Sequence, residues 1–496
     1  MLLASILVIS AVMLAVYLSW NPVFTVGLIA SIIAVGYLII KPSHASAFHL
    51  MILTLPFLAA FVIDIGGNLR VPYYFALIAL FLALYQGQLF IPRKSPAIWL
   101  LIAFVAYAFL STALTMGFEY PAEVESFGFR TSQFRPLIQA GQLTLMITFF
   151  YLTFNYLSSG ARLQLVSKLI FWSLVLVVTY GTYEVICALF DFSFFNINTN
   201  PDDLHNRYAG THPYASGGIW MLRPRSILLE PLNLGIYILF SFPFAFARLC
   251  YIRTGVARWL TLVVLALALL LFAMTWSRGA FIGMLVALPL ALVLVPSLRF
   301  RLLILLGGVF GYLAMGLIIF PMLGGNASIT SPATKIYERL HTVTSLPSAI
   351  RADSEAVELI GRSYYYPVAI FRKNPILGVG LGNYPIAFAE LTETPLAASA
   401  PFSLHLELLT QLGIIGSSFF YFLVGCILYR LFRTVRYHKR HTLRPLAVAS
   451  IVSIVGFMTA SAALGGLTTS SHLWVMLAIG LAIPYLMNQA EPASQP

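Results

Sequence analysis

Charged residues are scarce in this chain, at 9% of 496 residues, whereas soluble domains average about 25%. Hydrophobic residues make up 60%. This balance excludes a soluble globular protein and a disordered one, and it indicates an integral membrane protein with many spans. Cysteine is also scarce. Cys187, Cys250 and Cys426 lie in or beside apolar runs, and without a CxxC pair they indicate no disulfide framework.

Motifs that would define several other chemistries are also missing. The sequence contains no DxD, HExxH, GxSxG or Walker pattern and no Cys and His cluster with metal-ligand spacing. We therefore expect chemistry that uses no metal and no other cofactor, with arginines in place of a cation.

Long apolar runs fill most of the chain. A transmembrane helix needs about 20 mostly apolar residues, and about 14 such runs are present. We predict an all-α integral membrane protein with one large extracytoplasmic loop. The predicted spans are 3–19, 22–40, 46–63, 72–90, 97–114, 136–157, 167–190, 227–247, 259–275, 279–295, 302–320, 404–428, 445–463 and 470–488.

These spans give an expected domain organisation. Residues 1–320 hold helices 1–11 with short loops, and residues 321–401 form the large loop with short helices. Residues 402–488 hold helices 12–14, and residues 489–496 form a cytoplasmic tail. Within the large loop, the stretch 353–371 alternates apolar and charged residues, so we expect it to lie along the membrane surface.

Basic residues exceed acidic ones, at 29 against 17, for a net charge of +12. One set of alternate loops carries basic residues and no acid, ending with the run from Arg430 to Arg444. The other set carries almost every acid, including Asp202, Asp203 and Glu338. By the positive-inside rule the first set faces the cytoplasm, and an even number of spans puts both termini there. The excess charge therefore indicates orientation and not a nucleic-acid partner.

Arginines form three groups on the expected outer face. Arg223 and Arg225 precede Glu230 at the start of a span, Arg278 lies in a very short turn between two spans, and Arg362 lies in the large loop. Placing an arginine at the centre of a span costs roughly 2.5–3.5 kcal/mol of insertion free energy. Its planar guanidinium group can bind a phosphate through two hydrogen bonds. The cluster indicates a lipid-linked phosphate or pyrophosphate. Alternatively, these arginines reach lipid headgroups or pair with acids such as Glu230.

Two titratable residues lie at the first turns of the span that follows the large loop. Either His405 or Glu407 could accept a proton from a hydroxyl group. The alternative for each is an interface anchor or a helix cap.

Ahead of them, Gly378, Gly380 and Gly382 imitate a nucleotide-binding loop. We expect tight turns that let a substrate approach the backbone, since no strand–turn–helix pattern surrounds them.

In this order, from about residue 220 to 430, the motifs resemble the O-antigen ligase/polymerase superfamily of bacterial envelope glycan assembly. Its members have a GT-C-like membrane fold. The elements that carry the resemblance are Arg223 or Arg225 before Glu230-Pro231, the turn Ser277-Arg278-Gly279, the stretch from Pro375 to Tyr384, and the span entry around His405 with Gly413 and Gly416.

The resemblance implies a reaction and a set of roles. A hydroxyl of an acceptor sugar attacks the anomeric carbon of a glycan carried on undecaprenyl pyrophosphate, at the periplasmic face, and lipid pyrophosphate leaves. The implied catalytic residues are His405, Arg278 and Glu407. The implied pyrophosphate-binding residues are Arg223, Arg225, Arg278 and Arg362, and the implied substrate-binding residues are Glu230, Asn383 and Tyr384.

The sequence departs from the family at the span entry. In an ungapped alignment on Gly413, the family histidine falls on Phe402, and the family acid becomes Gln411. His405 lies three residues further on, close to the same helical face. It either supplies the same function one turn deeper, or this branch does not use that histidine. The departure favours a polymerase of O-antigen or exopolysaccharide repeat units over a ligase that transfers glycan to lipid A core.

The resemblance also implies a location and partners. The location is the bacterial inner (cytoplasmic) membrane, as a multi-pass protein whose active site faces the periplasm. The partners are the undecaprenyl-pyrophosphate-linked glycan donor, a glycan or lipid A core acceptor, membrane lipid, and a chain-length regulator or other envelope-assembly proteins. A lipid-linked oligosaccharide transporter (flippase) and a scaffold of an envelope complex are the competing classes. The absence of an internal repeat weighs against the transporter.

Overall fold

The structure is a computed structural model of the chain. It describes residues 43–58, 63–64, 68–88, 95–115, 135–190, 192, 223–228, 230–252, 254–275, 277–295, 364–392, 401, 403–438, 442–467 and 469–489. The predicted spans 3–19, 22–40 and 302–320 lie outside these residues, as does most of the large loop.

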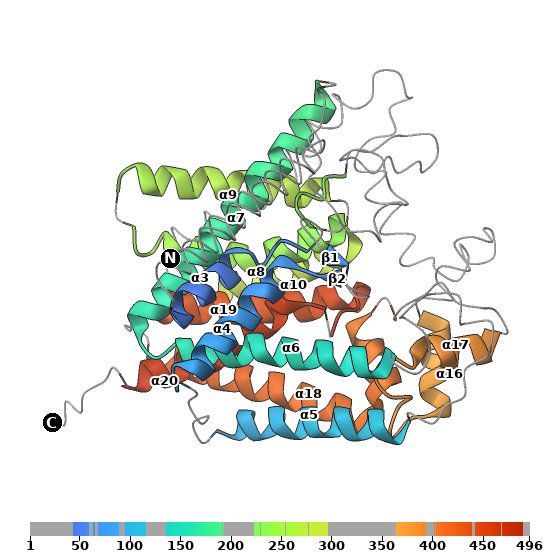
Figure 1. The fold of residues 1–496 in the computed structure, drawn as a ribbon. Helices are drawn as coiled ribbons and strands as arrows, with labels where there is room; N and C mark the ends of the chain where they lie inside the picture. The colour runs from blue at the N-terminus through green and yellow to red at the C-terminus, as the bar shows by residue number, and fades with distance from the viewer. Residues whose placement is uncertain are drawn as a thin grey trace, which may run out of the picture. The chain divides into compact units, whose positions relative to one another are not determined.

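The chain divides into two compact units, and the first comprises Met1–Ile91, Thr148–Tyr214 and Leu222–Trp276. In this unit α3 packs against α4 and α7, and α7, α8 and α9 pack against one another (Figure 1). Its described elements are α3 (His44–Leu53), β1 (Ile63–Asp64), β2 (Asn68–Leu69), α4 (Val71–Tyr85), α7 (Gly160–Leu189), α8 (Pro231–Arg248) and α9 (Val256–Met274).

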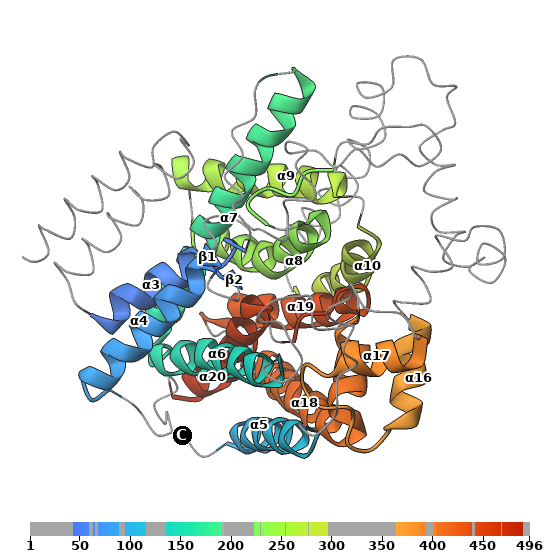
Figure 2. The same cartoon turned by 45° about the vertical axis from the view of Figure 1, so that its right-hand side comes forward.

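The second unit comprises Pro92–Ile147, Ala215–Met221 and Ser277–Pro496. Here α18 packs against α5, α16, α19 and α20, and α10 packs against α19 (Figure 2). Its described elements are α5 (Pro96–Leu114), α10 (Arg278–Leu294), α16 (Tyr366–Lys373), α17 (Tyr384–Thr392), α18 (Leu404–Tyr437), α19 (Arg444–Ala460), η5 (Ser461–Ala463) and α20 (Ser471–Gln489); α6 (Arg135–Tyr156) has residues in both units.

The described part of the chain is helical apart from the two-residue strands β1 and β2, which pair antiparallel. Seven of its helices are long and apolar enough to cross a membrane, by length and composition: α5, α6, α7, α9, α18, α19 and α20. Three shorter helices, α3, α4 and α10, are also apolar. The all-helical membrane architecture is therefore confirmed, while the expected count of about 14 spans stays a prediction.

The helices begin where the sequence supplies starting signals. The side chain of Ser159 accepts a hydrogen bond from the backbone of Arg162 at the start of α7, and that of Ser277 accepts one from Ala280 at the start of α10. Proline occupies the first turn of α4, α5, α8, α16 and α19, where its missing N–H costs nothing.

The single span predicted at 46–63 is wrong. Helix α3 ends at Leu53, and the backbone then turns at Thr54 before β1. Pro56 explains the ending, because proline has no N–H for the helical hydrogen bond and its ring clashes with the preceding turn. The apolar composition of this run therefore reports its burial and not a continuous helix.

Candidate functional site: a broken helix, a glycine-rich loop and an arginine turn

Helix α18 is a candidate membrane span where the sequence predicted one at 404–428, but its backbone is broken at Gly413. The φ and ψ angles of Gly413 are 61° and −167°, a combination that is open essentially to glycine alone. We call residues 404–412 the entry limb and residues 414–437 the long limb. The long limb alone, at about 1.5 Å per residue, reaches about 36 Å and is sufficient to cross a bilayer core.

The chain reverses direction at the break. The Nδ1 atom of His405 in the entry limb lies 2.6 Å from the hydroxyl oxygen of Tyr421 in the long limb, and their rings are stacked. In a straight helix these two residues, 16 positions apart, would be separated by about 24 Å. The entry limb therefore folds back beside the long limb.

The glycine-rich loop, residues 374–383 between α16 and α17, provides hydrogen-bond partners for the backbone groups that lack helical partners at the break. The N–H of Val379 donates to the carbonyl of Thr410 at 2.9 Å, and that of Gly380 donates to the carbonyl of Gln411 at 2.8 Å. On the other side of the break, the N–H of Ile414 donates to the carbonyl of Pro375 at 2.9 Å. Unpaired backbone groups are costly in a membrane, so the loop and the break stabilise each other.

Glycine is required on the loop side as well. Gly378, Gly380 and Gly382 have φ angles of 73°, 82° and 81°, which confirms the predicted tight turns. A Cβ atom at Gly378 would lie 2.5 Å from the backbone of Gln411. At this position, the close approach that glycine permits is therefore to the backbone of α18.

A polar stripe on α5 holds the same loop. The hydroxyl of Ser111 donates to the carbonyl of Leu377 at 2.9 Å, and the hydroxyl of Thr112 accepts from the N–H of Leu381 at 3.2 Å. Thr115 accepts from the carboxamide nitrogen of Asn383 through its hydroxyl at 3.2 Å. Sequence reasoning missed this stripe, although polar residues four positions apart share one helical face.

Gln411, at the position where the family acid was expected, contacts the glycine-rich loop. Its Oε1 atom accepts the N–H of Gly382 at 3.0 Å. An amide oxygen accepts one such bond as a carboxylate does, so the loop stays attached to the entry limb without a charge at this position.

Glu407 connects the entry limb to the segment between α19 and α20. Its carboxylate is 2% exposed and accepts the N–H groups of Gly466 at 2.6 Å and Leu467 at 3.2 Å. Nearby, the N–H of Leu404 donates to the carbonyl of Leu464 at 2.9 Å. The entry limb is therefore fixed to two connecting segments, one on each side.

The hydrogen bonds of His405 determine which of its ring nitrogens carries a proton. Its Nε2 atom lies 2.9 Å from the carbonyl oxygen of Met458, and a carbonyl can only accept. Nε2 is therefore protonated in the neutral ring, and Nδ1 accepts the hydroxyl proton of Tyr421. A further proton can add to the ring only at Nδ1, where Tyr421 lies. Sequence reasoning missed Tyr421.

Helices α16 and α17 cover the glycine-rich loop with a small apolar core. Tyr384 is buried in this core with Ile370, Val379 and Phe388. Burial raises the pKa of the Tyr384 hydroxyl, so it stays protonated at neutral pH. Asn383 is also buried, and its carboxamide nitrogen donates to the carbonyl of Val379 at 2.8 Å.

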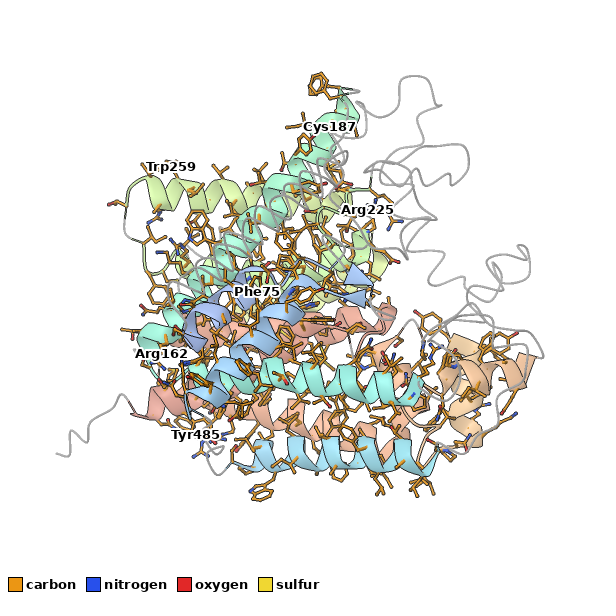
Figure 3. All side chains as sticks on the ribbon, viewed as in Figure 1. Phe75, Arg162, Cys187, Arg225, Trp259 and Tyr485 are labelled. Atoms are coloured by element: carbon orange, nitrogen blue, oxygen red, sulfur yellow. The ribbon has the colours of Figure 1, made fainter. Side chains whose placement is uncertain are left out.

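In the first unit, Arg223 and Arg225 lie in a turn ahead of α8. We call residues 223–226 the arginine turn. The Nε atom of Arg223 donates to the carbonyl of Thr275 at 3.0 Å. Arg225, labelled in Figure 3, is 3% exposed, and its backbone N–H donates to the carboxylate of Glu184 on α7. Glu230 is exposed and immediately precedes the first residue of α8. Sequence reasoning missed Glu184, although a lone acid in an apolar span is a signal for function.

The remaining predicted arginines are described less fully. Arg278 is the first residue of α10, directly after the Ser277 cap, and its side chain lies outside the described part. Arg362 lies outside the described residues altogether. Of the predicted site residues, the second unit carries His405 and Glu407 on the entry limb and Asn383 and Tyr384 where the glycine-rich loop meets α17, while the first unit carries Arg223 and Arg225 in one turn.

Within the described part of the chain, no group of three or more His, Cys, Asp and Glu side chains could hold a metal ion.

These features define a multi-pass helical membrane protein in which a glycine-rich loop seals a reversed helix. Residues 262–421 match the family model described as O-antigen ligase, which confirms over this part of the chain the resemblance to the O-antigen ligase/polymerase superfamily that the motifs indicated. The match includes Arg278, the glycine-rich loop, the break at Gly413 and Tyr421. It begins after Arg223 and Arg225 in the sequence. No curated protein matches the chain. The family match supports glycosyl transfer of the ligase and polymerase type, with a lipid-linked glycan donor and an acceptor in the membrane.

Proposed function

We propose that this protein polymerises O-antigen or exopolysaccharide repeat units, using undecaprenyl-pyrophosphate-linked glycan as the donor, at the periplasmic face of a bacterial inner membrane. The observation that carries the proposal is the family match, because it spans both the Arg278 turn and the loop-sealed break of α18. Charge segregation between alternate loops supports the orientation, with both termini in the cytoplasm.

In this proposal arginines neutralise the charge that develops on the leaving pyrophosphate. Arg223, Arg225 and Arg278 supply the guanidinium groups, together with Arg362 of the large loop. Hydrogen bonds to charged groups contribute about 1.5–3 kcal/mol each. The carbonyl that anchors Arg223 belongs to Thr275, three residues before Arg278, so one short motif supplies both the anchor and a further arginine.

The acceptor loses its proton towards His405. The oxygen of the acceptor hydroxyl forms a bond to the anomeric carbon, the bond from that carbon to the pyrophosphate oxygen breaks, and lipid pyrophosphate leaves with the electron pair. Because Nδ1 of His405 accepts the hydroxyl of Tyr421, we place Tyr421 on the proton path: it passes its proton to Nδ1 and takes the proton of the acceptor.

Other residues hold the site in shape and contact the sugar. Glu407 fixes the entry limb that carries His405, through the N–H groups of Gly466 and Leu467. Glu230, Asn383 and Tyr384 remain the proposed substrate contacts, with Asn383 also ordering the loop from which it projects.

A reconstitution tests the reaction. Purified protein in liposomes is incubated with undecaprenyl-pyrophosphate-linked repeat units alone, and the lipid-linked glycans are separated on a gel. A ladder of multiples is the expected result. Transfer that appears only after lipid A core is added identifies a ligase, and silence in both, with an authentic repeat unit, refutes glycosyl transfer.

One observation bears on the transporter alternative. Broken helices are common in transporters, where the unwound backbone coordinates ions or substrate, and α18 is broken. Here, however, the carbonyls of Thr410 and Gln411 accept N–H groups of the loop. The break is thereby closed by protein, which favours a fixed scaffold for an enzyme site.

A further inference from the structure

Glu184 is a buried acid within an apolar helix. It lies near the end of α7, a candidate membrane span, and is 1% exposed. A carboxylate in such surroundings is costly unless hydrogen bonds satisfy it, and acids inside spans commonly serve function.

The partners of Glu184 are the backbone groups of the arginine turn. Its carboxylate accepts the N–H of Arg225 at 3.1 Å and that of Ser226 at 2.7 Å. Two successive N–H groups directed at one anion form a concave anion-binding turn, and Glu184 fills it.

The backbone of this turn is strained. Ser226 has a φ of 56°, and it is the one non-glycine residue with a positive φ in the described part of the chain. Such a conformation costs free energy and persists only where the surroundings enforce it, commonly at functional sites. The hydroxyl of Ser226 also donates to the carbonyl of Val177 at 2.7 Å, so α7 holds the turn at two points.

The turn lies tightly against α7. A Cβ atom at Gly181 would lie 2.9 Å from Leu271 and 3.3 Å from the Cβ atom of Ser226. At its other end, Arg223 is fixed to the carbonyl of Thr275. The position of both arginines is therefore set by contacts to α7 and to the end of α9.

We propose that Glu184 is a positioning residue, which orders the turn from Arg223 to Ser226 so that both arginines are placed to bind the pyrophosphate of a lipid-linked donor. The inference rests on the proposed function for the identity of the donor. Without the carboxylate, the two N–H groups lose their acceptor and the turn relaxes from its positive φ. A displacement of about 1 Å in such a site can cost about a hundredfold in rate.

The test compares Glu184→Leu, which removes the acceptor at similar side-chain volume, with Ser173→Ala in the full-length protein in liposomes. Ser173 is a matched control because it is buried in the same helix and bonds Tyr237, away from the turn. We expect kcat/KM for the lipid-linked donor to fall at least tenfold in E184L and less than twofold in S173A. The KM for the acceptor and the melting temperatures of the two variants should agree within error. Equal donor kinetics in the two variants would overturn the inference.

A double-mutant cycle separates positioning from a merely structural role. Because Glu184 acts through the arginine turn, adding E184L to R225A should lower kcat/KM by a smaller factor than E184L does in the wild-type protein. Losses that multiply would overturn the inference.

Binding distinguishes this inference from the proposed function. If the wild-type protein forms no glycan, the proposed function fails, and the inference is judged by the binding of undecaprenyl pyrophosphate to detergent-solubilised protein. Binding at least tenfold weaker in E184L than in S173A supports the inference, and equal binding overturns it.

Discussion

Gly413→Ala is the substitution that most directly tests the sealed break. An alanine at this position must adopt φ and ψ angles that only glycine adopts readily. Its Cβ atom would also collide with the carbonyl of Ile376 and would lie 2.7 Å from the nitrogen of Gly378. Both neighbours are backbone atoms, which cannot rotate away as the end of a side chain can. The loop must therefore move off the helix.

The cost can be worked out from the contacts at the break. Backbone strain of this kind costs about 1–3 kcal/mol. Moving the loop also separates the hydrogen bonds that Val379, Gly380 and Ile414 donate, each worth about 0.5–1.5 kcal/mol. The lowest values of these ranges sum to about 2.5 kcal/mol, which shifts the equilibrium between docked and undocked loop by nearly a hundredfold.

Hydrogen–deuterium exchange measures that shift. The amides of residues 378–382 should exchange about a hundredfold faster in G413A than in the wild-type protein, and glycan transfer should fall in parallel. Gly425→Ala is the matched control, because Gly425 lies in the long limb of the same helix and its added Cβ would have no neighbour within 4 Å. The control should leave exchange in the loop unchanged and favour the helix by up to about 1 kcal/mol.

One result would refute this reasoning. If G413A inserts normally and its loop amides keep wild-type exchange rates, the loop is not held against the break by the contacts described here. A loss of transfer with unchanged exchange would separate activity from docking of the loop.

Three further substitutions test the proposed chemistry. Arg278→Ala should abolish glycan transfer while the protein still inserts. The control Arg258→Ala, on α9, should leave transfer unchanged. Normal transfer by R278A at normal expression would remove Arg278 from the site. His405→Ala should impair transfer more than Phe402→Ala, and the reverse order would assign the role to position 402, on which the family histidine falls in the ungapped alignment. Tyr421→Phe removes the hydroxyl that His405 accepts, and because positioned acid–base groups contribute about 10²–10⁴-fold, turnover should fall at least tenfold without a change in melting temperature. Unchanged turnover in Y421F would exclude Tyr421 from the proton path.

Helix positions could largely be predicted from the sequence. The run predicted at 97–114 corresponds to α5 (Pro96–Leu114), and the run predicted at 470–488 corresponds to α20 (Ser471–Gln489). Both are set by local composition, since a helix that crosses a bilayer needs a continuous apolar stretch and satisfies its own backbone. The signal is strong because it is repeated at every position of the stretch.

The reversal of α18 could not be predicted in this way. Hydropathy carries no information on the backbone φ and ψ angles. The apolar residues on both sides of Gly413 therefore read as one continuous span. The partner of His405 is Tyr421, 16 residues away, and no helical spacing relates them. A motif aligned along one straight helix therefore assigns neighbours that the folded chain does not have.

The hydrogen bonds that the buried acids accept explain why the roles of these acids were harder to predict from the sequence than those of the arginines. Glu184 and Glu407 each receive two N–H groups from a connecting segment, and Gln411 receives one, from Gly382. At each glutamate one oxygen, Oε2, accepts both N–H groups, and the two lone pairs of an amide oxygen could accept them as well. The number of converging donors therefore does not by itself distinguish a glutamate from a glutamine at these positions. Because backbone donors are the same for every residue except proline, the sequence carries no sign of them, and a buried acid that anchors a loop looks identical to one that moves a proton.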